Sequence, residues 1–353
     1  MERPNLFSFA TSELSQDAFL SWLLSWADQR YEASDPALHA VGQRLVERLL
    51  ALHGHELPSG PLRVSVQQQW KKLDVLALIN EQIVILIEDK VHTRQHSDQL
   101  RRYLGEAREQ WPKHALNPVY VQTGDQDSYH RVRQQGWEVF HRADLLQVLA
   151  EGELRGIQSD IFRDFYRHLR GIEHATQTYR TRPPSDGWHR AGWRGFFVAT
   201  QKALGEGGWH YVANPSGGFM GFYWNWVTIP HGKLYLQLEE ERLCVKVEVK
   251  DRAKRKEVRG VWWRLVTEAA TPTLPFERPK RLGSGTWMTV AVFHETTASQ
   301  TLTACWTWTR PWHGCAKLQL GFTNSPATTK GNDPDTPRFT QGLLRTGAAP
   351  GGL

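Results

Sequence analysis

Hydrophobic residues recur at helical spacing near the start of the chain and then give way to strand-like runs. Phe19, Leu20, Leu23 and Leu24 fall on one face, which predicts a helix through ELSQDAFLSWLLSWA with Thr11 or Ser12 at its cap. A second helix is expected over about 36–53. Three strands should follow the break at 58–61, namely LRVSVQQQW, KLDVLALI and QIVILIEDKV, the last two joined tightly at Asn80-Glu81.

The remaining pattern predicts more helices and strands and a change of architecture part-way along the chain. A helix over about 96–111 precedes the strands NPVYVQT and WEVFHR, and helices near 143–150 and 159–178 follow. This order predicts an α/β sandwich around a mixed sheet. The stretch RTRPPSDG resembles a linker. An α+β domain should follow, built from FYWNWVTI, KLYLQL, LCVKVEVK, TWMTVAVF, a helix over 253–269 and one or two strands within 306–322.

These elements divide the chain into two expected domains. The Thr-, Pro- and Gly-rich stretch from about Asn324 is expected to be disordered. We therefore expect a first domain over 1–179, a linker over 180–187, a Trp-rich basic α+β domain over 188–323 and a tail over 324–353.

Charge and tryptophan are distributed unevenly between the two parts. Residues 1–186 carry 22 Lys and Arg against 25 Asp and Glu, whereas residues 187–353 carry 21 against 12, a net charge of +9. Five of the 16 tryptophans lie in the first part and 11 in the second. A basic second part is typical of a surface that contacts a polyanion, although a basic surface also serves solubility.

Composition argues against several classes of protein. The three cysteines, Cys244, Cys305 and Cys315, lack the number and spacing of a disulfide framework or zinc ribbon. The N-terminal segment lacks a signal-peptide pattern, and no apolar run is long enough to span a bilayer. We therefore expect a cytoplasmic protein without membrane contact. The chain also lacks the GxSxG, P-loop and HExxH motifs, and has no GxGxxG after a strand.

The apolar stretch DVLALINEQIVILIEDKV begins and ends with charged residues. Residues two apart on a strand project to the same side, so Glu88 and Lys90 should point together, and a short hairpin brings Asp74 beside them. Two carboxylates at a sheet edge make an oxygen-rich site suited to Mg²⁺ or Mn²⁺. With a lysine beside them, they favour metal-assisted hydrolysis of a phosphodiester.

Asp74 followed by Glu88-Asp89-Lys90 in a hairpin resembles the PD-(D/E)XK nuclease superfamily, with Leu73 in place of the usual proline. The resemblance covers roughly residues 10–150 and implies a restriction-endonuclease-like αβββαβ core. It also implies Asp74 and Glu88 as metal ligands, Lys90 as the residue that assists the attacking water, and the carbonyl of Asp89 as a further ligand.

Two further stretches extend this resemblance. Gln99 and Tyr103 fit the QxxxY motif of the RecB-like branch, where such residues help position the substrate strand or the lysine. They lie four apart and share a helix face. The string SELSQDAFLSWLL resembles the opening of a bacterial subgroup of these nucleases, which implies Glu13 as an additional metal ligand, with Asp17 competing for the role.

Each of these residues also has an ordinary structural interpretation. The Asp, Glu and Lys set could be a salt bridge at a sheet edge, Gln99 and Tyr103 could be packing residues, and Glu13 could be a first-turn acid favoured by the helix dipole. His92 and His96 could be metal ligands or solvent-facing side chains. Lys71 and Lys72 could contact phosphate or form a solvated pair; we include Lys72 among the expected nucleic-acid contacts.

The second domain offers further candidates for contact with nucleic acid. Clustered Lys and Arg release counterions on binding, although a solvated helix start is an equally good interpretation of such a run. Tryptophans can stack on unpaired bases or form a core; the pairs Trp224/Trp226 and Trp306/Trp308 are each expected to line one sheet face in the core. The basic candidates are Lys250, Arg252, Lys254, Arg255, Lys256 and Arg259.

The function expected from these observations is a Mg²⁺- or Mn²⁺-dependent nuclease that cleaves DNA. By analogy, the resemblance implies a role in bacterial defence against foreign DNA. A homodimer or a regulatory partner protein is a further expectation. The alternative is a nuclease-fold protein that is catalytically silent or gated by a partner, and that serves as a nucleic-acid-binding or signal-binding module.

Overall fold

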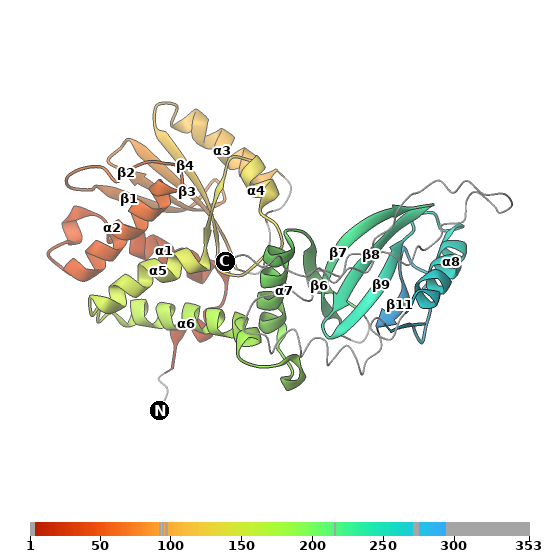
Figure 1. Ribbon diagram of the computed structural model, residues 1–353. Coiled ribbons are helices and arrows are strands. Elements are labelled where there is room, and N and C mark those ends of the chain that lie inside the picture. Colours follow the sequence, from red (N-terminus) through yellow and green to blue (C-terminus); the bar gives the residue numbers. More distant parts are fainter. Residues whose placement is uncertain are drawn as a thin grey trace, which may run out of the picture. The chain divides into compact units, whose positions relative to one another are not determined.

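The computed structural model describes residues 4–91, 93, 95, 98–214, 217–270 and 275–293. The chain divides between Ala175 and Thr176 into two compact units, the N-terminal unit and the C-terminal unit, which are described separately (Figure 1). The expected domain limits and linker stay predictions; short 3-10 turns occupy Thr178–Arg180 and Pro184–Asp186. In the described ranges, none of the helices has the length and apolarity needed to cross a membrane.

The N-terminal unit is an α/β sandwich around a five-stranded mixed sheet, as the sequence predicts. Strands run in the order β1-β2-β3-β4-β5, with antiparallel pairing up to β3 and parallel pairing beyond it. The strands are β1 Val64–Trp70, β2 Leu73–Ile79, β3 Ile83–Lys90, β4 Ala115–Gln122 and β5 Glu138–His141. The helices are α1 Glu13–Ser25, α2 Pro36–Ala51, α3 Gln99–Gln110, α4 His130–Gln134, α5 Arg142–Leu154 and α6 Asp160–Thr176.

Local sequence explains the turns that bring β1, β2 and β3 together. Asn80 and Glu81 have positive φ angles of 49° and 53°, as a two-residue hairpin loop requires. Lys71 and Lys72 form the other tight connection, with φ angles of 48° and 75°. Because the β2–β3 loop is short and the two strands are antiparallel, the start of β2 and the end of β3 meet at the same edge of the sheet.

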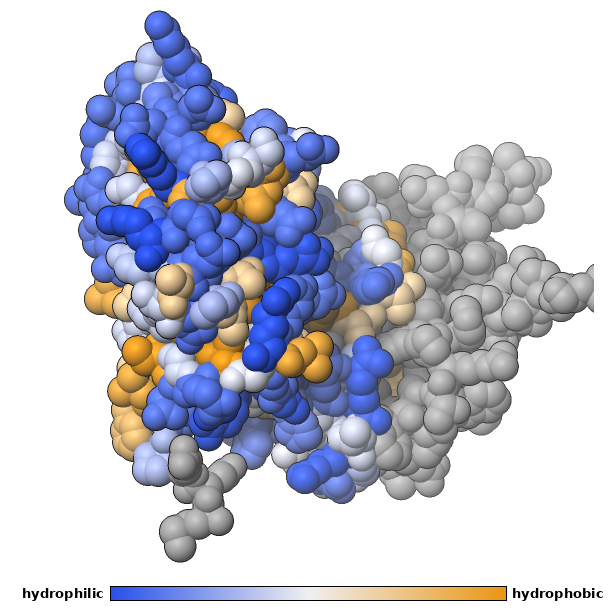
Figure 2. All heavy atoms as spheres, turned by 90° about the vertical axis from the view of Figure 1, so that its left-hand side faces the viewer, coloured by the Kyte–Doolittle hydropathy of each residue, from blue (hydrophilic) through white to orange (hydrophobic). Residues whose placement is uncertain are grey.

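Hydrophobic side chains cover both faces of this sheet. Ile85 and Ile87 of β3 belong to the core shared with α1, α2, α5 and α6, whereas Val84 and Leu86 belong to the core under α3. The continuously apolar strand is therefore buried on both faces, as expected. The side of this unit that faces the viewer in Figure 2 is mostly hydrophilic, with hydrophobic residues in separate small groups.

The C-terminal unit contains an antiparallel six-stranded sheet in the order β10-β11-β9-β8-β7-β6. Two helices, α7 and α8, contribute to one hydrophobic core with the inward-facing residues of the sheet. The elements are α7 Arg190–Leu204, β6 Gly208–Val212, β7 Phe219–Ile229, β8 Gly232–Glu239, β9 Arg242–Glu248, α8 Arg255–Glu268, β10 Phe276–Glu277 and β11 Trp287–Phe293. This arrangement agrees with the α+β fold class expected for this half.

Two features of this unit differ from the sequence-based expectation. Helix α7 and strand β6 were not expected between the linker and FYWNWVTI. Trp224 and Trp226 do not line the same face: Trp224 is buried in the core, and Trp226 is 44% exposed. The reason is a β-bulge, because Asn225 adopts a φ of 55° and the register shifts between Trp224 and Val227. The expected strands within 306–322, the pair Trp306/Trp308 and the tail lie outside the described residues.

Candidate active site

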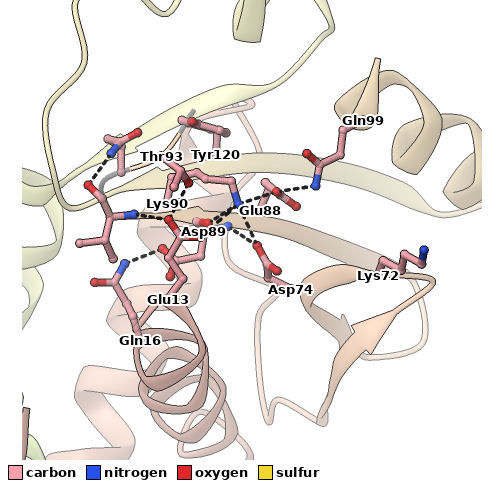
Figure 3. Close-up of polar contacts among 12 residues, drawn as sticks. Glu13, Gln16, Lys72, Asp74, Glu88, Asp89, Lys90, Thr93, Gln99 and Tyr120 are labelled. Carbon is pink, nitrogen blue, oxygen red and sulfur yellow. Dashed lines mark hydrogen bonds and ion pairs between the residues drawn. The ribbon is translucent and has the colours of Figure 1, made fainter. Parts of the chain in front are cut away.

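The structure brings Asp74, Glu88 and Lys90 together at the edge where β2 begins and β3 ends (Figure 3). The Lys90 Nζ lies 2.7 Å from Glu88 Oε1 and 3.6 Å from Asp74 Oδ2. It also donates a hydrogen bond of 2.7 Å to the backbone carbonyl of Asp89. The antiparallel register and the alternation of side chains along β3 account for this convergence.

Helix α3 holds Glu88 from the other side. Gln99 Nε2 donates to Glu88 Oε1 at 2.8 Å and lies 3.0 Å from the Tyr103 hydroxyl. That hydroxyl in turn donates to the backbone carbonyl of Lys72 at 2.6 Å. Gln99 and Tyr103 thus form a chain of hydrogen bonds from the β1–β2 turn to the buried glutamate, so both expected residues lie at the site.

Glu13 reaches the site from the first turn of α1. Its Oε1 accepts hydrogen bonds from the Val91 amide at 3.1 Å and the Thr93 hydroxyl at 2.7 Å, and its Oε2 lies 3.7 Å from Lys90 Nζ. Burial by itself would raise the pKa of Glu13, but these hydrogen bonds and the charge of Lys90 together lower it. Glu13 therefore stays ionised beside the lysine.

Burial and neighbouring charges shift the pKa values of the ionisable side chains at this site. Glu88 is fully buried, and burial together with repulsion from Asp74 raises its pKa to about 7 in spite of the nearby ammonium. Burial also opposes the charge of Lys90, but the surrounding carboxylates, Glu88 foremost, raise the pKa of Lys90 above its ordinary value. The lysine is therefore a permanent cation, whereas Glu88 titrates near neutral pH.

A second buried acidic pair lies behind the site and was not expected from sequence. The side chain of Asp89 points away from Glu88 and Lys90 toward α1, where Gln16 donates to it and accepts from Thr123 (Figure 3). Asp17 is also buried, and its carboxyl can hydrogen-bond to Asp89 when one of the two carries a proton. Burial first, and then the charge of the partner, raises the pKa of Asp89 well above that of an ordinary aspartate.

The donor atoms suit a hard divalent cation, although Lys90 now takes the central position. Within the described part of the chain, no group of three acidic, histidine or cysteine side chains is spaced to hold a metal ion. The ammonium lies among the carboxylates of Glu13, Asp74 and Glu88, which is where a cation is electrostatically favoured. Glu88 Oε2 is buried without a hydrogen-bond partner among the described residues. This oxygen without a partner and the all-oxygen donor set are of the kind that binds a hard divalent cation such as Mg²⁺ or Mn²⁺.

Comparison with known proteins adds one decisive observation to this geometry. Residues 4–151 match the family model of the PD-(D/E)XK nuclease superfamily. This part of the chain belongs to that superfamily. The match covers the sheet, helices α1 to α4 and most of α5, and hence every residue of the PD-(D/E)XK site described above. No curated protein and no solved structure gives a significant match to the chain.

Other residues expected at the PD-(D/E)XK site lie apart from it or are not among the described residues. The side chain of Lys72 is exposed and points away from the carboxylates (Figure 3), while Lys71 lies over Trp70 with its Nζ 5.1 Å from the ring centre. Both lysines are on the turn that the Tyr103 hydroxyl contacts. His92 and His96 are outside the described residues.

The basic run of the C-terminal unit divides into structural and exposed members. Arg255 donates to the backbone carbonyls of Val249 and Lys250 and to the Thr286 hydroxyl, and Arg259 donates to the carbonyl of Gly283. These two arginines thus fasten the start of α8 to neighbouring loops. Lys254 pairs with Glu257 at 2.9 Å. The exposed members of the run are Lys250, Arg252 and Lys256.

Proposed function

We propose that the N-terminal unit is a metal-dependent nuclease that hydrolyses phosphodiester bonds of DNA. The observation that carries the proposal is the position of Lys90 Nζ, within 3.7 Å of carboxylates from α1, β2 and β3 inside a nuclease-superfamily domain. A structural salt bridge needs one carboxylate for one lysine. Three converging carboxylates leave excess negative charge, which is what a divalent cation neutralises.

Asp74 and Glu88 would hold the metal, with Glu13 and the carbonyl of Asp89 as further oxygen donors. When bound, a divalent cation supplies Lewis-acid stabilisation of negative charge and lowers the pKa of a coordinated water. The hydrogen bond from Gln99 fixes one oxygen of Glu88, so that the other oxygen, Oε2, is the one left for the cation. Gln99 therefore acts as a positioning residue for Glu88.

Lys90 is the residue that we assign to the reacting atoms. Its ammonium can orient the attacking water and donate hydrogen bonds to the oxygens of the phosphorus centre as negative charge develops there. In the reaction, the water oxygen bonds to phosphorus and gives up a proton to solvent, the bond to the leaving sugar oxygen breaks, and that oxygen takes up a proton in exchange. The raised pKa of Lys90 keeps it charged throughout the physiological pH range.

The resemblance further suggests a role in defence against foreign DNA, which we include in the proposal. A regulated form of the same enzyme is supported by one specific observation, the ammonium of Lys90 among the carboxylates. In that form, the lysine would move aside only when substrate or a partner is bound.

A cleavage assay with purified full-length protein tests the proposal. Linear duplex, supercoiled plasmid, single-stranded DNA and RNA are offered with Mg²⁺, Mn²⁺ or EDTA, beside Glu88→Ala and the exposed control Glu109→Ala. We expect DNA cleavage that needs the metal and is lost only in Glu88→Ala. Metal binding without cleavage of any substrate would favour the gated form. Neither metal binding nor cleavage would refute the enzyme and favour a binding module.

A further inference from the structure

The β-bulge in β7 turns one tryptophan out of the core of the C-terminal unit. Trp224 lies opposite Leu236 and Val227 lies opposite Leu234, so that Asn225 and Trp226 together face the single residue Tyr235. In a regular strand Trp226 would point into the core like Trp224. Asparagine tolerates the left-handed φ of 55° that the bulge needs. The sequence therefore supports a local irregularity whose effect is to expose a large aromatic ring.

The exposed ring is held in a fixed orientation. Trp226 stacks on Tyr235 with ring centres 4.0 Å apart and an interplanar angle of 16°, and Tyr223 lies edge-on to it at 6.1 Å. Tyr235 itself is buried. One side of the Trp226 indole is thus occupied by protein, while 44% of the residue stays exposed. A partly exposed aromatic ring that its neighbours hold in place is suited to stacking against another flat ring, at little cost in side-chain entropy.

A second tryptophan lies on the same face of the sheet. We call this face the outer face, since the residues that alternate with those of the core project from it. Trp287 precedes the buried Met288, is paired with Glu248 and is 62% exposed. Strands β8 and β9 separate it from Trp226, and the row of Trp287 reaches β7 at Thr228, two residues beyond Trp226. At the usual strand and residue spacings, the two tryptophans lie about 16 Å apart. The outer face therefore presents two aromatic platforms rather than one.

A cation lies between these platforms. In the strand register, Lys233 of β8 lies opposite Glu248 of β9, which in turn lies opposite Trp287 of β11. The Nζ of Lys233 lies 5.9 Å from the ring centre of Trp226. Aromatic rings with interspersed cations, in a half of the chain with a net charge of +9, complement a ligand that carries both flat rings and negative charge. Unpaired nucleotides have both features. In a duplex, the bases are stacked on one another and present no free ring faces.

We propose that the outer face binds single-stranded nucleic acid, with unpaired bases stacked on Trp226 and Trp287 and a phosphate beside Lys233. Base stacking on aromatic side chains tolerates any sequence, so this surface would hold a strand without selecting particular bases. The inference rests on the proposed nuclease function, for which it names an unpaired strand as the form of nucleic acid recognised. It assigns the recognition to residues other than the basic run at the start of α8.

Fluorescence anisotropy with labelled oligothymidine, oligouridine and a duplex of the same length tests this inference. The full-length protein is used in EDTA, so that binding is measured without cleavage. We expect the single strands to bind more tightly than the duplex, and Trp226→Ala to weaken their binding about 5- to 100-fold. Trp226→Phe should restore most of the affinity, because it keeps a stacking ring. The two single-stranded probes distinguish DNA from RNA as the preferred strand.

The matched control is Tyr211→Ala, which removes a 37% exposed aromatic ring whose register partner, Met220, belongs to the core face. Thermal unfolding checks that each variant is folded. Single-strand affinity in Trp226→Ala equal to that of Tyr211→Ala would overturn the inference, as would a wild-type protein that binds no single strand. Cleavage is scored separately: intact binding with no cleavage refutes only the nuclease, and cleavage with binding independent of Trp226 refutes only this surface.

Discussion

Replacement of Asp17 by asparagine should stabilise the protein, and the gain should grow with pH. Asp17 is 2% exposed, and both of its carboxyl oxygens lack a hydrogen-bond donor among the described residues. Burial, followed by repulsion from Asp74, raises its pKa to about 7. An asparagine has nearly the same shape, carries no charge and can donate an amide hydrogen to Asp89.

The size of the effect follows from the difference in proton affinity between the folded and unfolded states. The folded state binds more protons than the unfolded state between the ordinary pKa of 3.8 and about 7, so the wild-type protein loses stability as pH rises through that range. At about 1.4 kcal/mol per pH unit, the cost is about 1.6 kcal/mol at about pH 5 and as much as about 4 kcal/mol at about pH 8. Asp17→Asn removes this cost.

Urea unfolding followed by tryptophan fluorescence, at about pH 5 and about pH 8, measures the difference. The exposed Glu109→Gln serves as the control for the loss of one surface carboxylate, and its stability should follow the wild type at both pH values. An increase in the free energy of unfolding of Asp17→Asn that is larger at the higher pH supports the reasoning. A gain that is equal at both pH values, or a loss of stability, would refute it.

Three further predictions concern the site and the basic run. Gln99→Ala should lower the rate of cleavage about 10- to 100-fold, because Glu88 loses the hydrogen bond that positions it. Steady-state kinetics measure this rate beside that of the exposed control Gln110→Ala, and equal rates for the two variants would show that the bond is unimportant. Mn²⁺ affinity measured by calorimetry should fall by up to about tenfold per pH unit below about pH 7, as Glu88 takes up a proton, and a flat profile would contradict this. Arg255→Ala should cost about 1–3 kcal/mol of stability in thermal unfolding, because its guanidinium donates to three backbone carbonyls and a hydroxyl; Lys256→Ala should cost little, and equal losses would count against the structural role.

The sequence allowed the proximity of residues to be predicted where they are close in sequence or lie on strands joined by a tight turn. The apolar run of β3 ends in charges, and Asn80 and Glu81 tolerate the positive φ angles of a two-residue loop, so the meeting of Asp74 with Glu88 and Lys90 follows from strand geometry. The helical spacing of Gln99 and Tyr103 likewise placed both residues on one face of α3.

Contacts that depend on how distant elements pack were not predictable. The hydrogen bonds from Thr123 to Gln16 and from Gln16 to Asp89 link the residue that follows β4 to α1 and β3, and the core between these elements sets their relative rotation. No spacing rule in the sequence pairs Asp17 with Asp89. The buried acidic pair therefore became visible only in three dimensions.

Local irregularity accounts for the two misjudged features of the C-terminal unit. Helix α7 contains Gly192 and Gly195, which lower helix propensity and obscure the helical pattern. At Gly195 a Cβ atom would lie 1.8 Å from the carbonyl oxygen of Thr176, so the close approach of the two segments requires glycine. The bulge at Asn225 shifts the strand by one residue and reverses the side on which Trp226 lies.

The most direct test of the central claim is metal-dependent DNA cleavage by Lys90→Ala, measured beside Lys90→Arg and the exposed control Lys113→Ala. Circular dichroism and thermal unfolding establish that each variant is folded. The account predicts cleavage at the wild-type rate for Lys113→Ala, a strongly reduced rate for Lys90→Arg, and no cleavage by Lys90→Ala. A folded Lys90→Ala protein that cuts DNA at the wild-type rate would contradict the assignment of this site.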